Sequence, residues 1–360
     1  MKVVLAIDSF KGCLSSVDAE RAAACGVRQV MPHAQVVCLP MSDGGEGMTA
    51  AFVAAMRGTT VTVPTHDPLM RPIMATYGLS PDGATAIVES AAASGLMLLA
   101  SHERNPLVAT SYGTGELMAH AARSGCRRII VGLGGTATSD AGRGMLEALG
   151  VKCNGTTIDD SQCVLRGIEV VAASDVSNPL CGPLGAARMF APQKGATPAM
   201  VEQLETRTMQ FAQLTAAHLH RDVSARPGAG AAGGIGFALM AYADATITSG
   251  ADVLLDLLNF DKIIDDANLV ITGEGSADAQ TLLGKLPHGV MRRAKRHGVP
   301  TALIAGKVRR REQLLEAGFH SVTCINDFAD ISENCMEPEV AMRNITTTTA
   351  RLVAEYRQNG

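Results

Sequence analysis

The chain has 360 residues, 47% of them hydrophobic, and a formal net charge of −4. Because a single hydrophobic core seldom grows past about 250–300 residues, this length favours two domains. The slightly acidic balance argues against a nucleic-acid-binding protein, which needs broad positive charge.

The cysteines and the N-terminus both indicate a cytoplasmic protein. The nine cysteines are odd in number and no two have C-x-x-C spacing, so we expect free thiols in a reducing compartment. The apolar stretch that begins the chain ends at Asp8, which makes it too short for a signal peptide. No apolar run reaches the roughly 18 residues of a membrane-spanning helix, so no membrane partner is expected.

The first part of the chain alternates short apolar runs with helical patterns. Residues 3–7 predict a buried strand, residues 17–30 a helix, residues 35–39 a second strand, residues 48–56 a second helix and residues 59–63 a third strand. This order is typical of a parallel sheet with crossover helices. Ligands of such sheets bind at the carboxyl ends of the strands.

The pattern changes after residue 63. Residues 64–68 resemble a linker, and residues 73–79 and 84–89 predict a hairpin that turns at Pro81-Asp82-Gly83. The remaining predicted elements are helices at about 115–123, 200–220, 235–242 and 340–357, and strands at 128–131, 268–272, 301–305 and 321–325.

These elements predict an α/β protein of two domains around a cleft. The two chain ends, residues 1–64 and about 262–360, would form a discontinuous Rossmann/flavodoxin-like domain with a parallel sheet. Residues from about 65 to 261 would form a second α/β domain inserted into it.

Five short runs are rich in glycine, and four of them also contain acidic residues. They are residues 8–12 (DSFKG), 43–47 (DGGEG), 132–142 (GLGGTATSDAG), 228–234 (GAGAAGG) and 271–275 (ITGEG). Glycine lets backbone N–H groups approach an anion closely, and carboxylates serve as Mg²⁺ ligands or proton acceptors. The combination predicts phosphoryl transfer.

Each run also has a structural explanation, which the sequence leaves open. Acids such as Asp8 and Glu46 could simply stabilise the first turn of the helix that follows. Residues 228–233 match the G-x-G-x-x-G spacing, but Arg226-Pro227 precedes it where a strand should end, which argues against a dinucleotide site. That run could equally be a closely packed Gly/Ala helix start.

A P-loop is not expected. The pairs Gly284-Lys285 and Gly306-Lys307 lack both the upstream glycine and the following Ser or Thr of a Walker A sequence.

Taken together, the runs resemble the bacterial glycerate kinase family, the type unrelated to P-loop and ribokinase-like kinases. The resemblance covers nearly the whole chain in one order. Its segments are residues 8–12, 43–47, 67–69, 111–117, 132–144, 175–180, 192–196, 227–234, 271–275 with Asp278 and Gln280, and 284–290. It implies transfer of the ATP γ-phosphate to D-glycerate with Mg²⁺, with 2-phosphoglycerate the favoured product. Whether the protein forms a homo-oligomer stays open.

The runs and the resemblance together nominate the site residues. Catalytic roles fall to Asp8, Lys11, Asp43, Asp175, Lys194, Glu274 and Asp278, with Asp43 and Glu274 as Mg²⁺ ligands. Nucleotide binding falls to Gly134, Gly135, Thr136, Thr138, Asp140, Gly142, Gly228, Gly230, Gly233 and Gly234. Substrate binding falls to Ser9, Gly44, Gly45, Glu46, Gln280 and Lys285.

The chain departs from the family pattern at several positions. The most consequential is Ser276, which stands where an Arg usually follows Gly-Glu-Gly. A guanidinium is a rigid bidentate partner for a carboxylate or phosphate. Two alternatives therefore stay open: a kinase of another small hydroxy acid, and a catalytically silent regulator that binds a nucleotide or metabolite.

Overall fold

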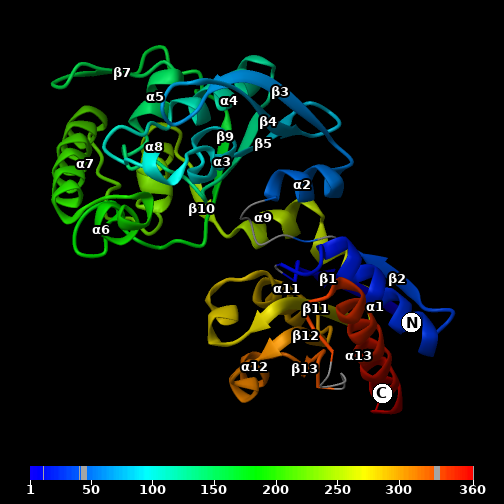
Figure 1. Ribbon diagram of the computed structural model, residues 1–360. Coiled ribbons are helices and arrows are strands. Elements are labelled where there is room, and N and C mark those ends of the chain that lie inside the picture. Colours follow the sequence, from blue (N-terminus) through cyan, green and yellow to red (C-terminus); the bar gives the residue numbers. More distant parts are fainter. Residues whose placement is uncertain (11, 40, 42–46, 328–332, 360) are drawn as a thin grey trace. The chain divides into compact units, whose positions relative to one another are not determined.

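The computed structural model describes residues 1–10, 12–39, 41, 47–327 and 333–359 (Figure 1). The chain divides into two compact units, which we call unit 1 (residues 1–43 and 251–360) and unit 2 (residues 44–250). The two ends of the chain therefore share one unit, and the second is inserted into it. The divisions fall at 43/44 and 250/251, whereas the sequence placed them at 64/65 and 261/262.

Unit 1 contains a five-stranded sheet in the order β13-β12-β11-β1-β2, and all its neighbouring strands are parallel. Its strands are β1 (Lys2–Ile7), β2 (Gln35–Cys38), β11 (Leu269–Ala277), β12 (Thr301–Val308) and β13 (Ser321–Cys324). The predicted parallel sheet of unit 1 is thus confirmed, although β11 and β12 extend beyond the residues expected. Both strands continue because they pair with each other as far as Ala277 and Val308.

Helices cover both faces of this sheet. They are α1 (Ser16–Val30), α9 (Gly250–Leu257), α10 (Phe260–Ile264), α11 (Leu286–Arg296), α12 (Arg311–Ala317) and α13 (Pro338–Asn359), with the 3-10 helix η5 (Ala279–Leu283). Ile304 of β12 belongs to the core that contains Val353 of α13, whereas its neighbour Leu303 belongs to the core that contains Met291 of α11. Successive side chains of a strand point to opposite faces, so the sheet is buried on both sides, which explains its continuous apolar runs. Helices α1 and α13 lie side by side on one face (Figure 1).

Unit 2 contains a six-stranded mixed sheet in the order β10-β9-β6-β5-β4-β3. Strands β5 (Thr85–Glu89), β6 (Arg128–Gly132), β9 (Glu169–Ala173) and β10 (Thr246–Thr248) are parallel, and β3 (Thr59–His66) and β4 (Pro72–Leu79) add antiparallel. Strands β7 (Lys152–Cys153) and β8 (Ile158–Asp159) form a small separate ladder.

The helices of unit 2 pack around this sheet, with Leu117 of α4 and Phe237 of α8 in the same core as Val131 of β6. They are α2 (Met48–Met56), α3 (Ala91–Ser94), α4 (Tyr112–Arg123), α5 (Arg143–Ala148), α6 (Ala186–Phe190), α7 (Pro198–Leu219) and α8 (Ile235–Tyr242). The 3-10 helices are η1 (Leu96–Leu98), η2 (Ser101–Glu103), η3 (Pro192–Lys194) and η4 (Ala231–Gly234).

A strand is present at residues 59–63 as predicted, but its placement in the first sheet and the linker predicted at residues 64–68 were wrong. Strand β3 does not join the sheet of β1 and β2, and the expected linker begins inside it, because Thr59 to His66 pair antiparallel with β4. The strand alternates threonine with valine, and most of its residues are exposed or half-buried. Such alternation is typical of an edge strand with one solvated face rather than of a buried parallel strand.

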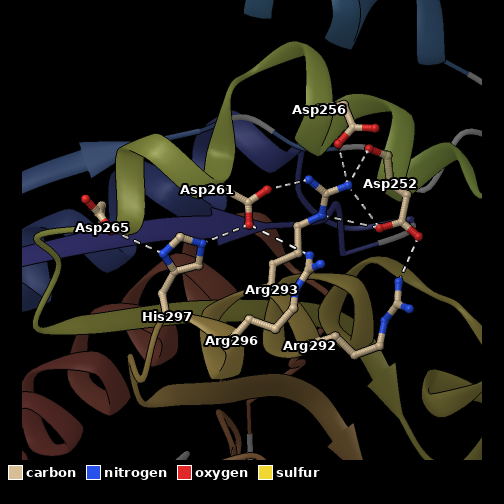
Figure 2. Close-up of polar contacts among 8 residues, drawn as sticks. All are labelled: Asp252, Asp256, Asp261, Asp265, Arg292, Arg293, Arg296 and His297. Atoms are coloured by element: carbon tan, nitrogen blue, oxygen red, sulfur yellow. Dashed lines mark hydrogen bonds and ion pairs between the residues drawn. The ribbon is translucent and has the colours of Figure 1, made fainter.

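A network of ion pairs holds α11 against α9 and α10 (Figure 2). The side chain of Arg293 is only 8% exposed, and its guanidinium lies 2.6 Å from Asp256, 2.8 Å from Asp261 and 3.3 Å from Asp252. His297, just after α11, reaches Asp261 at 3.2 Å. Removing one partner from a buried ion pair leaves the other charges buried and uncompensated, so this network should contribute strongly to the packing of α11 against α9 and α10.

Among the described residues, no helix combines the length and apolarity that crossing a membrane requires.

Candidate functional site

A pocket of about 480 Å³ opens at the carboxyl ends of β1, β11, β12 and β13 in unit 1. This is the edge at which ligands of parallel sheets bind, and the volume falls within the usual range for small-molecule sites. The residues that line the pocket are Asp8, Ser9, Phe10, Cys13, Glu274, Gly275, Ser276, Lys285, Gly306, Lys307, Ile325, Asn326, Cys335, Met336 and Ala341.

Glu274 is the most strongly held acid of this pocket. It is 6% exposed and lies inside β11 rather than in a loop after it. Its Oε1 accepts a hydrogen bond of 2.6 Å from the hydroxyl of Thr281, and its Oε2 accepts one of 3.0 Å from the ammonium of Lys285. Lys285 is the residue directly before α11.

Asp8 and Ser9 follow β1 and line the same pocket. The backbone N–H of Asp8 donates to the carbonyl of Gly273 at 2.9 Å, so β11 holds the residue in place. The Asp8 carboxylate accepts a hydrogen bond of 2.7 Å from the backbone N–H of Ser9. Asp8, Ser9, Glu274 and Lys285 are the predicted site residues that the structure brings together in unit 1.

Asp278 and Gln280 do not line the pocket. The carboxylate of Asp278 accepts a hydrogen bond of 2.8 Å from the backbone N–H of Gln280, and so it caps the 3-10 helix η5. The other predicted residues of this region lie outside the described residues: Lys11, Asp43, Gly44, Gly45 and Glu46.

The sequence analysis missed Lys307 and Asn326. The pair Gly306-Lys307 follows an apolar run, as the predicted loops do, and this position is the sequence signal that could have identified Lys307. The amide of Asn326 donates to the carbonyl of Gly306 at 2.8 Å. No sequence pattern marks Asn326, because its role depends on the pairing of β12 with β13.

In unit 2, Lys194 packs against the loop that follows β6. It is 4% exposed, and its ammonium donates to the carbonyl of Thr138 at 2.5 Å and to the hydroxyl of Thr136 at 3.3 Å. Burial lowers the pKa of Lys194 to about 8, and the charge of Asp140 opposes this shift. The Lys194 side chain therefore holds the backbone of the loop after β6 in position through Thr136 and Thr138.

Two of the glycine runs pack directly against each other. A Cβ on Gly233 would lie 2.0 Å from the carbonyl oxygen of Thr138, and one on Gly142 would lie 2.5 Å from the side chain of Ala238. The backbone N–H of Ala141 donates to the carbonyl of Gly233 at 3.0 Å. Close packing accounts for glycine at these positions. That they also bind nucleotide stays a prediction.

The other predicted nucleotide-binding glycines differ in how closely their surroundings pack against them. A Cβ on Gly230 would meet the carbonyl oxygen of Pro179 at 2.4 Å, one on Gly234 the Cα of Ala141 at 2.6 Å, and one on Gly228 the side chain of Ile247 at 3.0 Å. In contrast, a Cβ on Gly134 would have nothing within 4 Å. Gly134 is therefore the predicted nucleotide-binding glycine whose backbone has room for a ligand, whereas its neighbour Gly135, which has a φ of 66°, would bring a Cβ to 3.3 Å from the side chain of Ala91.

Asp140 has a clear structural task. Its carboxylate accepts hydrogen bonds from the backbone N–H groups of Ser111, Gly142 and Gly144 at 2.9–3.1 Å and from the Ser111 hydroxyl at 2.8 Å. Asp175 is exposed and follows β9, the strand next to β6.

Within the described residues, no three His, Cys, Asp or Glu side chains gather in a way that could hold a metal ion. The predicted pair of Mg²⁺ ligands includes Asp43, which lies outside these residues, so Glu274 is its described member.

The chain matches the model of the glycerate kinase family over residues 3–357. The glycerate kinase of Haemophilus influenzae is 40% identical over an alignment that covers 98% of this chain and 99% of that protein. The glycerate 2-kinase of Escherichia coli K12 is also 40% identical, and its alignment covers 97% and 98%. A crystal structure from Salmonella typhimurium LT2, assigned as glycerate kinase 2, has a TM-score of 0.89 and 40% identity and covers 100% of this chain and 99% of that one. The chain therefore belongs to the glycerate kinase family, a family of phosphotransferases with an alcohol group as acceptor.

Proposed function

We propose that the protein is an ATP-dependent kinase of D-glycerate that produces 2-phosphoglycerate and works in the cytoplasm. The family match over nearly the whole chain supports the substrate, and the name of the Escherichia coli relative supports the product. The observation that carries the proposal is the pocket of unit 1, where Asp8, Glu274 and Lys285 line one cavity.

The acceptor acid binds in this pocket. D-Glycerate carries one carboxylate and two hydroxyls, and the pocket offers hydroxyls at Ser9 and Ser276, cations and two acids. We assign Glu274, held by Thr281 and Lys285, to Mg²⁺, and we assign the proton of the reacting hydroxyl to Asp8, the other acid that lines the pocket. A general base placed within hydrogen-bond reach typically contributes about 10²–10⁴-fold to the rate.

The nucleotide binds to unit 2 at the loop that follows β6, where Gly134 leaves the backbone open. Backbone N–H groups of such a loop can hold phosphate oxygens. Lys194 supports this loop through Thr136 and Thr138 and adds positive charge beneath it. Positioning and charge stabilisation are the main demands of phosphoryl transfer.

Mg²⁺ fits the chemistry of the residues present, because hard carboxylate oxygens are its preferred protein ligands. Kinase sites usually supply one or two carboxylates and leave the remaining positions to phosphate oxygens and water, so a group of three protein ligands is not needed. Glu274 would hold the ion, with Asp43 as its predicted second ligand. When bound, Mg²⁺ neutralises charge on the transferred phosphoryl group.

The test is turnover of ATP by the purified protein with D-glycerate and Mg²⁺, with the product identified by phosphorus NMR. We expect 2-phosphoglycerate. Turnover with another hydroxy acid but not with glycerate would overturn the substrate, and 3-phosphoglycerate would overturn the product.

The role of Asp8 has its own variant pair. Asp8→Asn should lower kcat by about 10²–10⁴-fold and leave the melting temperature nearly unchanged. Asp265→Asn is the matched control, because Asp265 is an exposed acid of the same unit that does not line the pocket. Equal kcat values for the two variants would remove Asp8 from the mechanism.

A further inference from the structure

Ser276 and Lys307 stand opposite each other on neighbouring strands. They are register partners in the parallel pair of β11 and β12, and both line the pocket of unit 1. Side chains paired across adjacent strands project from the same face of a sheet. A long side chain at either position therefore starts from almost the same place at the rim of the pocket.

Lys307 differs from Lys285 in its charge environment. The ammonium of Lys285 is already paired with Glu274 at 3.0 Å. Lys307 is exposed, and no described residue gives its ammonium a hydrogen bond or ion pair. The described part of the pocket holds two acids, Asp8 and Glu274, and two lysines. Without Lys307 its net charge would be negative, and the pocket would repel an anionic substrate.

The backbone beneath Lys307 is held rigidly. The carbonyl of Gly306 accepts the amide of Asn326 at 2.8 Å, and Asn344 in turn donates to Asn326 at 3.1 Å. A Cβ on Gly306 would lie 2.7 Å from the carbonyl oxygen of Gly275, so the two strands approach closely just before the Ser276 and Lys307 pair. The ammonium of Lys307, which has no partner among the described residues, therefore extends from a fixed stretch of backbone, and this lowers the entropic cost of binding an anion.

We propose that Lys307 binds the carboxylate of the acceptor acid, so that β12 supplies the cation that Ser276 of β11 cannot. This inference rests on the proposed function, because it assigns one group of the acceptor to one residue of the same pocket. It makes Lys307 a specificity-determining residue: it favours an acid over an uncharged alcohol of the same shape.

The first experiment replaces the cation. Lys307→Ser should raise the KM for D-glycerate by about 10- to 100-fold, the range expected for loss of a charge-assisted hydrogen bond, while the KM for ATP changes less than about threefold. Lys262→Ser is the matched control, since Lys262 is an exposed lysine of α10 that does not line the pocket. It should leave both KM values unchanged. D-Glyceramide, which lacks the negative charge, should inhibit the wild type and the Lys307 variant with similar constants.

The second experiment transposes the pair. The double variant Ser276→Arg with Lys307→Ser removes the cation from β12 and places a new one on β11, at the edge of the same pocket. It should recover most of the lost affinity and bring the KM for D-glycerate to within about fivefold of wild type. Recovery by the second substitution is an outcome that a merely structural role of Lys307 does not give.

The contrary outcomes are distinct. No turnover of D-glycerate by the wild type counts against the proposed function. Normal wild-type turnover with an unchanged KM for glycerate in Lys307→Ser counts against this inference alone. A rise in the KM for ATP instead would assign Lys307 to a phosphate of the nucleotide and overturn its role toward the acceptor. If the double variant has the melting temperature of the wild type but keeps the high KM of Lys307→Ser for D-glycerate, a cation at position 276 cannot replace the one at position 307. That result would overturn the proposed equivalence of the two positions.

Discussion

Glu20 lies buried in α1 next to the end of β1. Replacing it with glutamine should stabilise unit 1 at neutral pH. The side chain is 1% exposed, and its Oε1 accepts the backbone N–H of Ile7 at 3.2 Å at the end of β1. Its Oε2 has no hydrogen-bond partner among the described residues. Burial raises the pKa of Glu20 to about 9, while the hydrogen bond from the backbone of Ile7 opposes the shift. The carboxyl group is therefore protonated in the folded protein at pH 7.

The magnitude follows from the difference between the folded and unfolded pKa values. In the unfolded chain Glu20 ionises near its ordinary pKa of 4.5, whereas the folded protein retains the proton up to about pH 9. The folded state binds more protons in this window, so its stability falls as pH rises, by about 1.4 kcal/mol per pH unit. Between pH 5 and pH 7.5 the loss amounts to about 3 kcal/mol. Glu20→Gln keeps the shape and the acceptor oxygen and has no proton to lose.

The assay is urea unfolding of wild type and Glu20→Gln at pH 5 and pH 7.5. Hydrogen exchange of peptides from β1 and α1 follows unit 1 separately from unit 2. The variant should gain about 3 kcal/mol relative to wild type between the two pH values. A difference in stability that does not change with pH would refute the reasoning. So would a wild type that is the more stable protein at pH 7.5, because its carboxylate would then be charged and stabilised in the fold.

Three further predictions concern stability. The folded pKa of Lys194, about 8, lies below its ordinary 10.5. The wild type should therefore gain about 2 kcal/mol relative to Lys194→Met between pH 7.5 and pH 9.5, measured by urea unfolding. Arg293→Met should cost about 3–5 kcal/mol, whereas Arg296→Met, which loses an exposed pair at 3.8 Å, should cost less than about 1 kcal/mol; similar losses would contradict the buried network. Gly233→Ala should cost at least about 2 kcal/mol through its φ of 67° and its contact with backbone. Gly134→Ala should leave the melting temperature unchanged and raise only the KM for ATP, and the reverse pattern would contradict the division of the glycines.

The sequence predicts the sheet of unit 1 because its strands are buried on both faces and read as short apolar runs. Helices α2 and α8 also coincide with the predicted residues 48–56 and 235–242. Strand β3 was misplaced, since the order of elements along the chain does not say which sheet a strand joins. Its pairing with β4 is decided by a hairpin, and the alternation of threonine and valine is the local signal of an edge strand.

The candidate site also has residues that local sequence identifies and residues whose role depends on contacts between distant segments. Glu274 and Lys285 lie in recognisable local runs, and the structure brings them to one pocket. The glycine runs of unit 2 are as clear in sequence, yet local sequence cannot separate an open glycine from a packed one. Gly134 faces open space and Gly233 meets the backbone of Thr138, and only the contact between two segments distant in the chain makes the difference.

Position 276 shows why a departure from a family pattern is best judged in the sheet. Read along the chain, Ser276 is the loss of a guanidinium, and that loss made the substrate less secure. Read across the sheet, its register partner is Lys307, a cation at the rim of the same pocket. A ligand carboxylate responds to the position of a charge and not to the strand that carries it. A serine at position 276 therefore argues against binding of an acid only where the partner strand offers no cation. In this protein the partner strand β12 offers the ammonium of Lys307.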